Sequence, residues 1–178
     1  MWSTLASRVA YENPWIRVRE DAVQRPDGTP GVYGVVEVRS PAVFVVAVTA
    51  QDEILLVTLD RYTTGRSSVE VPAGGSDGED LLVAAQRELR EETGYAASDW
   101  RALGAVHSLN GVADAPGQVF LATGLTMVGG AETDAEGIDA ARAVPVPEVV
   151  AMVARGEISD NESLGALLLG LVALGRVS

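Results

Sequence analysis

Three glutamates near residue 90 are the side chains of this sequence best suited to chemistry. Glu88, Glu91 and Glu92 fall within an arc of about 100° on a helix predicted over Asp80 to Thr93, a stretch without Gly or Pro. The arrangement is locally unfavourable, because these like charges lie about one turn apart and near the end of the helix where the dipole disfavours them. A hard divalent cation, which takes oxygen ligands, would reverse this effect. The spacing therefore predicts a metal site, and the alternative is a solvated acidic helix face.

The residues around these glutamates extend the pattern. Seven residues after Glu79 comes the run Arg87-Glu88-Leu89-Arg90-Glu91-Glu92-Thr93-Gly94-Tyr95. This stretch closely resembles the Nudix box of the Nudix hydrolases: Gly, five residues, Glu, seven residues, Arg-Glu, an aliphatic, any residue, Glu-Glu, any residue, Gly, an aliphatic. Two positions depart from it. Ala73 stands where the first Gly is expected, so the loop from Gly74 is one residue short, and Tyr95 replaces the aliphatic.

The resemblance implies a role for each residue of the box. Glu91 and Glu92 would be the first metal ligands and act in catalysis, Glu88 would be a further ligand, and the main-chain carbonyl of Ala73 another. Arg87 would orient Glu91 or its neighbours, since metal ligands need outer partners. The implied cofactor is Mg²⁺, with Mn²⁺ as the alternative. Glu79 would support the loop and helix, unless it is a first-turn glutamate favoured by the dipole.

Two stretches before the box resemble those that lead into it in ADP-ribose pyrophosphatases, namely Arg61-Tyr62-Thr63-Thr64-Gly65 and Glu70-Val71-Pro72-Ala73-Gly74. The implied reaction is hydrolysis of a nucleoside diphosphate linked to another group, above all ADP-ribose to AMP and ribose 5-phosphate. Another nucleotide sugar or a noncanonical nucleotide is an alternative substrate. A non-catalytic sensor of nucleotide metabolites is the alternative from a different class, although it usually lacks the box glutamates that this chain retains.

Other candidates lie outside the box, each with a structural alternative. Arg61 could pair with a substrate phosphate, which arginine does well in bidentate geometry, or be a solvated arginine at a strand end. Glu70 could contact substrate or support the metal site, or be a half-exposed strand residue. Trp15 could stack on adenine, or be part of the core. His107, the only histidine, is predicted to be a polar residue at a strand end and not the catalytic base.

The acidic segment Ala131 to Gly137 is the candidate for a mobile catalytic loop. Related enzymes place a further carboxylate here, as a general base or an extra metal ligand, and the flanking glycines permit movement. We expect Glu136 to serve ahead of Glu132 because it lies nearer the following strand. An exposed acidic loop is the alternative.

The surrounding segments predict an α/β fold. Strand patterns cover Val32 to Val38, Ala42 to Val48 and Ile54 to Leu59, and the last two are apolar throughout, as in strands buried on both faces. Ser159 and Glu162 are spaced as a capping box that opens a last helix, which would end near Leu174. The resemblance implies a Nudix-type α/β/α sandwich with a mixed β-sheet and an N-terminal antiparallel strand extension. The chain is predicted to be a single domain over 1–178, with a dimerising strand region at 1–42 and the catalytic core at 43–178.

Composition excludes several function classes. The chain has 178 residues, no cysteine and a net charge of −12, which excludes disulfides and thiolate metal sites and argues against nucleic-acid or anionic-membrane partners. We see no signal peptide, and the longest apolar stretch, Leu164 to Leu174, is too short to span a bilayer. The expected protein is cytoplasmic, acts on a small-molecule nucleoside diphosphate and forms a homodimer.

Overall fold

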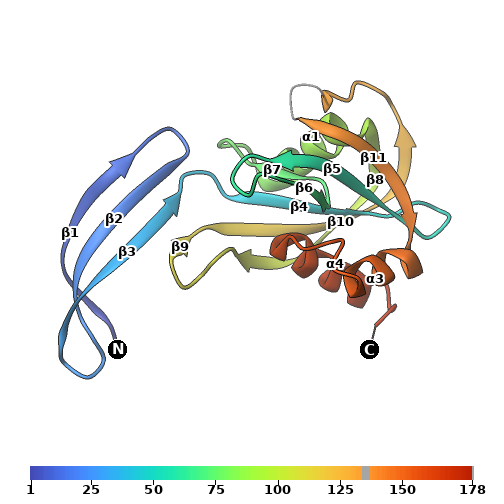
Figure 1. Cartoon of the computed structure of the whole chain (residues 1–178). Coiled ribbons are helices and arrows are strands. Elements are labelled where there is room, and N and C mark those ends of the chain that lie inside the picture. The colour runs from blue at the N-terminus through green and yellow to red at the C-terminus, as the bar shows by residue number, and fades with distance from the viewer. Residues whose placement is uncertain (134–136, 178) are drawn as a thin grey trace.

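The N-terminal strands form a sheet that extends away from the rest of the molecule (Figure 1). The computed structural model describes residues 1–133 and 137–177. Strands β1 (Ser3–Glu12), β2 (Ile16–Gln24) and β3 (Pro30–Val38) are antiparallel neighbours in sequence order. The short strand β9 (Ala113–Asp114), from a distant loop, pairs in parallel with β3. Every residue of β1 is exposed, so this sheet, which confirms the predicted strand extension, has little core of its own.

Two further sheets form the centre of the body. In the first, the order is β7 (Ala73–Gly75), β4 (Ala42–Ala47), β10 (Pro116–Met127) and β8 (Tyr95–His107), with β4 and β10 parallel and the other pairs antiparallel. In the second, β5 (Glu53–Arg61) lies antiparallel to both β11 (Ile138–Pro145) and β6 (Arg66–Glu70). The predicted mixed arrangement of strands is confirmed.

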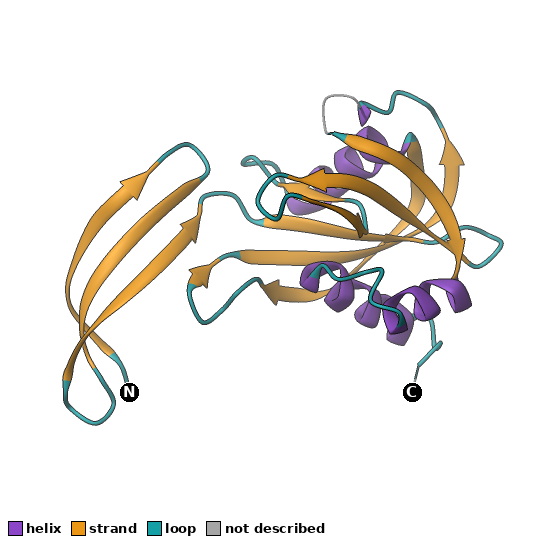
Figure 2. Ribbon diagram, in the orientation of Figure 1, coloured by secondary structure: helices purple, strands orange, loops and turns teal. Residues whose placement is uncertain are grey.

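Helices cover both faces of these sheets, as Figure 2 shows. Successive side chains of a strand point to opposite faces. On β4, Val43 and Val45 therefore pack with Ala85 and Leu89 of α1 (Leu81–Thr93), whereas Val46 faces the other core. That second core includes Met152 of α3 (Val146–Ala154) and Leu167 of α4 (Asn161–Ala173). The continuous apolar runs of β4 and β5 thus reflect burial on both sides, and the α/β/α sandwich is confirmed.

The ends of α1 and α4 are defined by their capping residues. Asp80 caps α1 by accepting from the amide of Leu82, and Gly94 ends the helix in a left-handed conformation with φ 74°, where the sequence predicts its end. The predicted capping box at the start of α4 is wrong. The N-cap is Asp160, not Ser159, and its carboxylate accepts from the amide of Ser163 at 2.7 Å.

Within the described parts of the chain, no helix has the length and apolar character that crossing a membrane requires.

Two glycines of α4 give a matched test of helix packing. A Cβ on Gly170 would lie 2.7 Å from a methyl carbon of Val46, whereas a Cβ on Gly165 would meet no atom within 4 Å. We expect Gly170→Ala to destabilise the protein by about 1–3 kcal/mol through overpacking. The control Gly165→Ala should stabilise it by up to about 1 kcal/mol, since alanine is the better helix former. Denaturant unfolding of both variants measures the difference, and equal effects would contradict the close packing of α4 on β4.

Candidate active site

Arg87 is the hub of the acidic face of α1. Its guanidinium donates to Glu79 at 2.9 Å, to Glu88 at 2.8 Å and to Glu91 at 3.0 Å, and also to the carbonyl of Gly75 at 2.8 Å. The hydrogen bond to Glu79, followed by those to Glu91 and Glu88, raises the pKa of Arg87 above its usual value. The structure therefore brings together the residues of the box that sequence reasoning singled out, with one cation among three carboxylates.

Two of the box carboxylates, Glu88 and Glu92, are buried against β7. Oε2 of Glu92 accepts from the amide of Ala73 at 2.9 Å, and Glu88 and Glu92 are both almost wholly buried. The carboxylate of Glu88 lies directly against Gly74, where a Cβ would come within 2.0 Å of its Oε1. The missing side chain at Gly74 is thus what makes room for Glu88, since only glycine allows so close an approach.

The box carboxylates suit a hard divalent cation by their chemistry. Glu88, Glu91 and Glu92 offer oxygen atoms only, and a neighbouring main-chain carbonyl such as that of Ala73 adds an uncharged oxygen, the ligand set preferred by Mg²⁺. In residues 1–133 and 137–177 no three acidic or histidine side chains are grouped closely enough to hold a metal ion as they stand. Arg87 occupies one oxygen each of Glu88 and Glu91, and in this arrangement it supplies the positive charge that those two carboxylates need.

The loop before α1 closes in a tight turn, which accounts for its missing residue. Asp77 and Gly78 both have positive φ, at 51° and 87°, and the amide of Glu79 donates to the carbonyl of Ser76 at 2.8 Å. Two central residues in the left-handed region are the signature of a type I′ turn, for which Asp-Gly is a favoured pair. Ser40 accepts from the amide of Asp77 at 2.7 Å and fixes the turn to the segment before β4.

A pocket of about 800 Å³ is lined by residues outside the box, among them Arg61 and Glu70. Nε of Arg61 donates to Glu70 at 2.9 Å, and a second bond joins the same two side chains. This pairing raises the pKa of Arg61, and the charges of Asp160 and Glu92 raise it further. Glu70 lies three residues before Ala73, whose amide donates to Glu92, so this short segment joins the pocket to the box. The alternative interpretation of Glu70 as a half-exposed strand residue is wrong, since the residue is buried.

Hydroxyl and acidic groups line another part of the pocket. Thr63, Thr64, Ser67 and Ser68 come from the hairpin of β5 and β6. Asp160 and Glu162 come from the start of α4, and burial raises the pKa of the Asp160 carboxyl. Sequence reasoning missed Asp160 as a residue of the site. The sequence signal for Asp160 is its place three residues before Ser163, which suits an N-cap of α4; the neighbouring Ser159 was predicted to be the cap instead.

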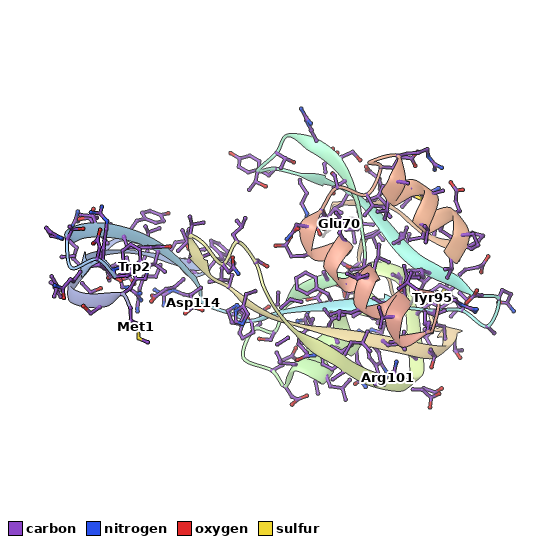
Figure 3. The ribbon with its side chains drawn as sticks, turned by 90° about the horizontal axis from the view of Figure 1, so that it is seen from below. Met1, Trp2, Glu70, Tyr95, Arg101 and Asp114 are labelled. Atoms are coloured by element: carbon purple, nitrogen blue, oxygen red, sulfur yellow. The ribbon has the colours of Figure 1, made fainter. Side chains whose placement is uncertain are left out.

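Trp15 and His107 lie outside this constellation. Trp15 is 73% exposed, lies in the turn before β2 and does not line the pocket. Figure 3 shows the sheet that carries Trp2 set apart from the body that carries Glu70. His107 is the exposed last residue of β8, which confirms its predicted place at a strand end.

The acidic loop after β10 is described only in part. The amide of Glu132 donates to the carbonyl of Glu91 at 2.7 Å, so the first half of the loop lies against the end of α1. The side chain of Glu132 is exposed. Glu136, the favoured general base, lies outside the described residues.

Comparisons with known proteins agree with this arrangement. The family model described as the NUDIX domain matches residues 38–164, and that of the nucleoside diphosphate sugar hydrolase N-terminal domain matches residues 2–36. An ADP-ribose pyrophosphatase of Mycobacterium tuberculosis (strain ATCC 25618 / H37Rv) is 35% identical over 94% of this chain and 82% of its own length. An ADP-ribose pyrophosphatase of Bacillus subtilis (strain 168) is 34% identical over 70% of this chain and 68% of its own.

Two further matches bear on substrate and fold. The CMP-5'-(N-acetyl-N-hydroxy-3-aminopropyl)phosphonate hydrolase of Streptomyces rubellomurinus (strain ATCC 31215) is 30% identical over 98% of this chain and 84% of its own length. The crystal structure of an ADP compounds hydrolase superposes with a TM-score of 0.85 at 20% identity, covering 99% of this chain and 97% of that one. At that identity the structural match shows a shared fold.

Proposed function

The chain belongs to the Nudix hydrolase family, and on this premise we propose that it hydrolyses ADP-ribose to AMP and ribose 5-phosphate. The observation that carries the proposal is the pairing of Arg61 with Glu70, three residues before Ala73, whose amide donates to Glu92 of the box. A phosphate-binding cation next to cation-binding carboxylates is what hydrolysis of a pyrophosphate requires. The similarity to ADP-ribose pyrophosphatases supports the choice of substrate.

Nudix hydrolases generally use divalent metal ions, and we propose Mg²⁺ here, with Mn²⁺ as the alternative. Glu88, Glu91 and Glu92, with the carbonyl of Ala73, would hold the cation. A bound divalent ion neutralises charge on the pyrophosphate and lowers the pKa of a coordinated water. Arg87 holds Glu88 and Glu91 in place, and the amide of Ala73 does the same for Glu92. The carboxylates are thereby fixed before substrate arrives.

The remaining residues bind and orient the substrate. Glu70 engages Arg61 through Nε and Nη2, which leaves the N–H groups of Nη1 for a substrate phosphate. In the reaction a water oxygen bonds to one phosphorus, the bridging P–O bond to that phosphorus breaks, and the second phosphate leaves with the bridging oxygen. One proton of the water passes to a base, for which we propose a carboxylate of the acidic loop, Glu136 ahead of Glu132, and the other stays on the new phosphate.

Trp15 and the N-terminal sheet would act through a homodimer. Trp15 does not line the pocket of its own chain, and we propose that it stacks on adenine in the partner's site. Support comes from the sheet itself, because Leu5, Tyr11 and Val32 are more than half exposed and β1 leaves an open edge. An edge strand with exposed apolar side chains is a template for pairing with another chain. The net charge of −12 argues against a nucleic acid as the ligand. A cytoplasmic location stays a prediction.

The Streptomyces relative favours one alternative, a different nucleotide-linked substrate, because it matches 98% of this chain. Turnover of ADP-ribose, a CMP-linked phosphonate, GDP-sugars and noncanonical nucleoside triphosphates with Mg²⁺ decides between them. Phosphorus NMR should show AMP and ribose 5-phosphate with ADP-ribose as the best substrate. No turnover of any of them would favour the sensor.

Removal of the box carboxylates should abolish activity without unfolding the chain. Loss of a residue that hydrogen-bonds a metal ligand lowers activity roughly 10- to 100-fold. We expect Glu91→Gln and Glu92→Gln, which change the ligands themselves, each to lower kcat by more than this. The fold should survive because glutamine at position 92 can still accept from the amide of Ala73. Glu148→Gln, an exposed glutamate on α3, is the control with unchanged activity. Rates are measured with and without chelator, and near-normal turnover in both variants would refute the metal site.

The acidic loop should supply the general base. We expect Glu136→Gln to lower kcat by about 10²- to 10⁴-fold with a small change in KM, because a base acts mainly in the transition state. Glu132→Gln is the matched variant on the same loop and should have the smaller effect. Both are assayed at saturating Mg²⁺. A change in kcat below tenfold in both would leave water activation to the metal and the box alone.

The dimer depends on the N-terminal sheet. We expect light scattering to give twice the chain mass of 18.6 kDa at micromolar concentration. Val32→Arg, at a side chain that is 68% exposed, should produce monomers because a charge would be buried between two sheets. Val172→Arg on α4, at a side chain that is 56% exposed, is the control that should remain dimeric. A monomeric wild-type protein would overturn the proposal.

A further inference from the structure

Four consecutive residues, Glu70 to Ala73, connect the pocket to the box, and each is held by a different part of the fold. Glu70 pairs with Arg61, and the amide of Ala73 donates to Glu92. Between them, the carbonyl of Pro72 accepts from the amide of Val45 on β4 at 2.8 Å. A shift of this short segment would therefore move the phosphate-binding arginine and a metal-binding glutamate together.

Val71 is the point where this segment passes between two sheets. It follows the last residue of β6 and precedes β7, and it is completely buried. Its amide donates to Oγ of Ser163 at 3.1 Å, across 92 residues of sequence. A buried amide without an acceptor is costly, so the serine hydroxyl takes the place of a strand partner at this crossing.

Ser163 is itself rigidly placed. Its side chain is 1% exposed in the first turn of α4, and its own amide donates to the cap residue Asp160. Asp160 in turn lines the pocket. One turn of α4 thus carries a wall of the pocket on one side and the hydrogen bond to Val71 on the other.

We propose that Ser163 is a positioning residue that sets the place of the Glu70–Ala73 segment and, through it, of Arg61 and Glu92. The proposal rests on the proposed function, in which Arg61 binds phosphate and Glu92 binds the cation. Ser163 does not touch the substrate. It acts through the main chain of Val71, so its removal should disturb both substrate binding and cation binding although it lies on a helix remote from the box in sequence.

Three variants separate positioning from simple loss of stability. Ser163→Ala removes the acceptor, and Ser163→Thr keeps the hydroxyl. Ala166→Gly, at a completely buried position of the same helix, weakens α4 without touching the link to Val71. Amide exchange is followed by NMR, and Mn²⁺ binding by titration without substrate, at a temperature where all variants are folded.

We expect Ser163→Ala to speed exchange of the Val71 and Ala73 amides at least tenfold relative to the amides of α1, and to weaken Mn²⁺ binding at least fivefold. Ser163→Thr should stay close to wild type, and Ala166→Gly should lower the melting temperature without these local effects. In turnover, Ser163→Ala should both lower kcat and raise KM for ADP-ribose.

The proposal is overturned if Ser163→Ala and Ala166→Gly give the same exchange pattern, or if Ser163→Thr behaves like Ser163→Ala. Failure of the proposed function has a different signature, because the wild-type protein would then not hydrolyse ADP-ribose. In that case the exchange of Val71 and Ala73 still decides whether Ser163 holds the segment.

Discussion

Burial of negative charge on α1 is the constraint on which the rest of the site depends. A carboxylate removed from water must find a charge or hydrogen-bond donors, or it is strongly destabilising. Glu88 and Glu92 are nearly inaccessible, and the structure meets their requirements partly from within the helix and partly from the strand beside it. Arg87 binds Glu88, the amide of Ala73 binds Glu92, and Gly74 contributes by having no side chain. The position of β7 beside α1 follows from these needs as much as from its pairing with β4.

Apolar packing within the sandwich holds α1 in the position where these carboxylates are buried. Because β4 presents alternate residues to two cores, α1 is packed on one face while α3 and α4 close the other. The helix that carries the carboxylates is thus held by apolar contacts on its inner side, including those of Ala85 and Leu89. On the opposite side of the sheets, the start of α4 lines the pocket through Asp160 and Glu162. Ser163 of the same turn accepts from the amide of Val71, in the segment that leads to Ala73 beside α1.

Sequence reasoning found what local patterns encode. The box helix, its end at Gly94 and the doubly buried strands followed from residue types and their spacing, and the structure confirms them. The cap of α4 was misassigned, because Ser159 and Asp160 are both residue types that cap helices well, and the structure has Asp160 at the N-cap. Spacing also could not reveal the hydrogen bond from Val71 to Ser163 or the burial of Glu70, which arise from contacts between distant segments. Strand β1 carries no clear alternation to predict it, since all its residues face solvent in a single chain.

The turn at Asp77 and Gly78 has a consequence for how the chain length of this region can change. The turn is closed by the hydrogen bond from the amide of Glu79 to the carbonyl of Ser76. Its two central residues belong neither to β7 nor to α1. An insertion or deletion there alters the reach of the loop while leaving the register of β7 against β4 and the rotation of α1 untouched. The Glu70–Ala73 segment cannot change length in this way, because each of its residues forms a hydrogen bond with a different part of the fold. Evolutionary change in loop length is therefore expected to accumulate on the helix side of Gly75 and not before it.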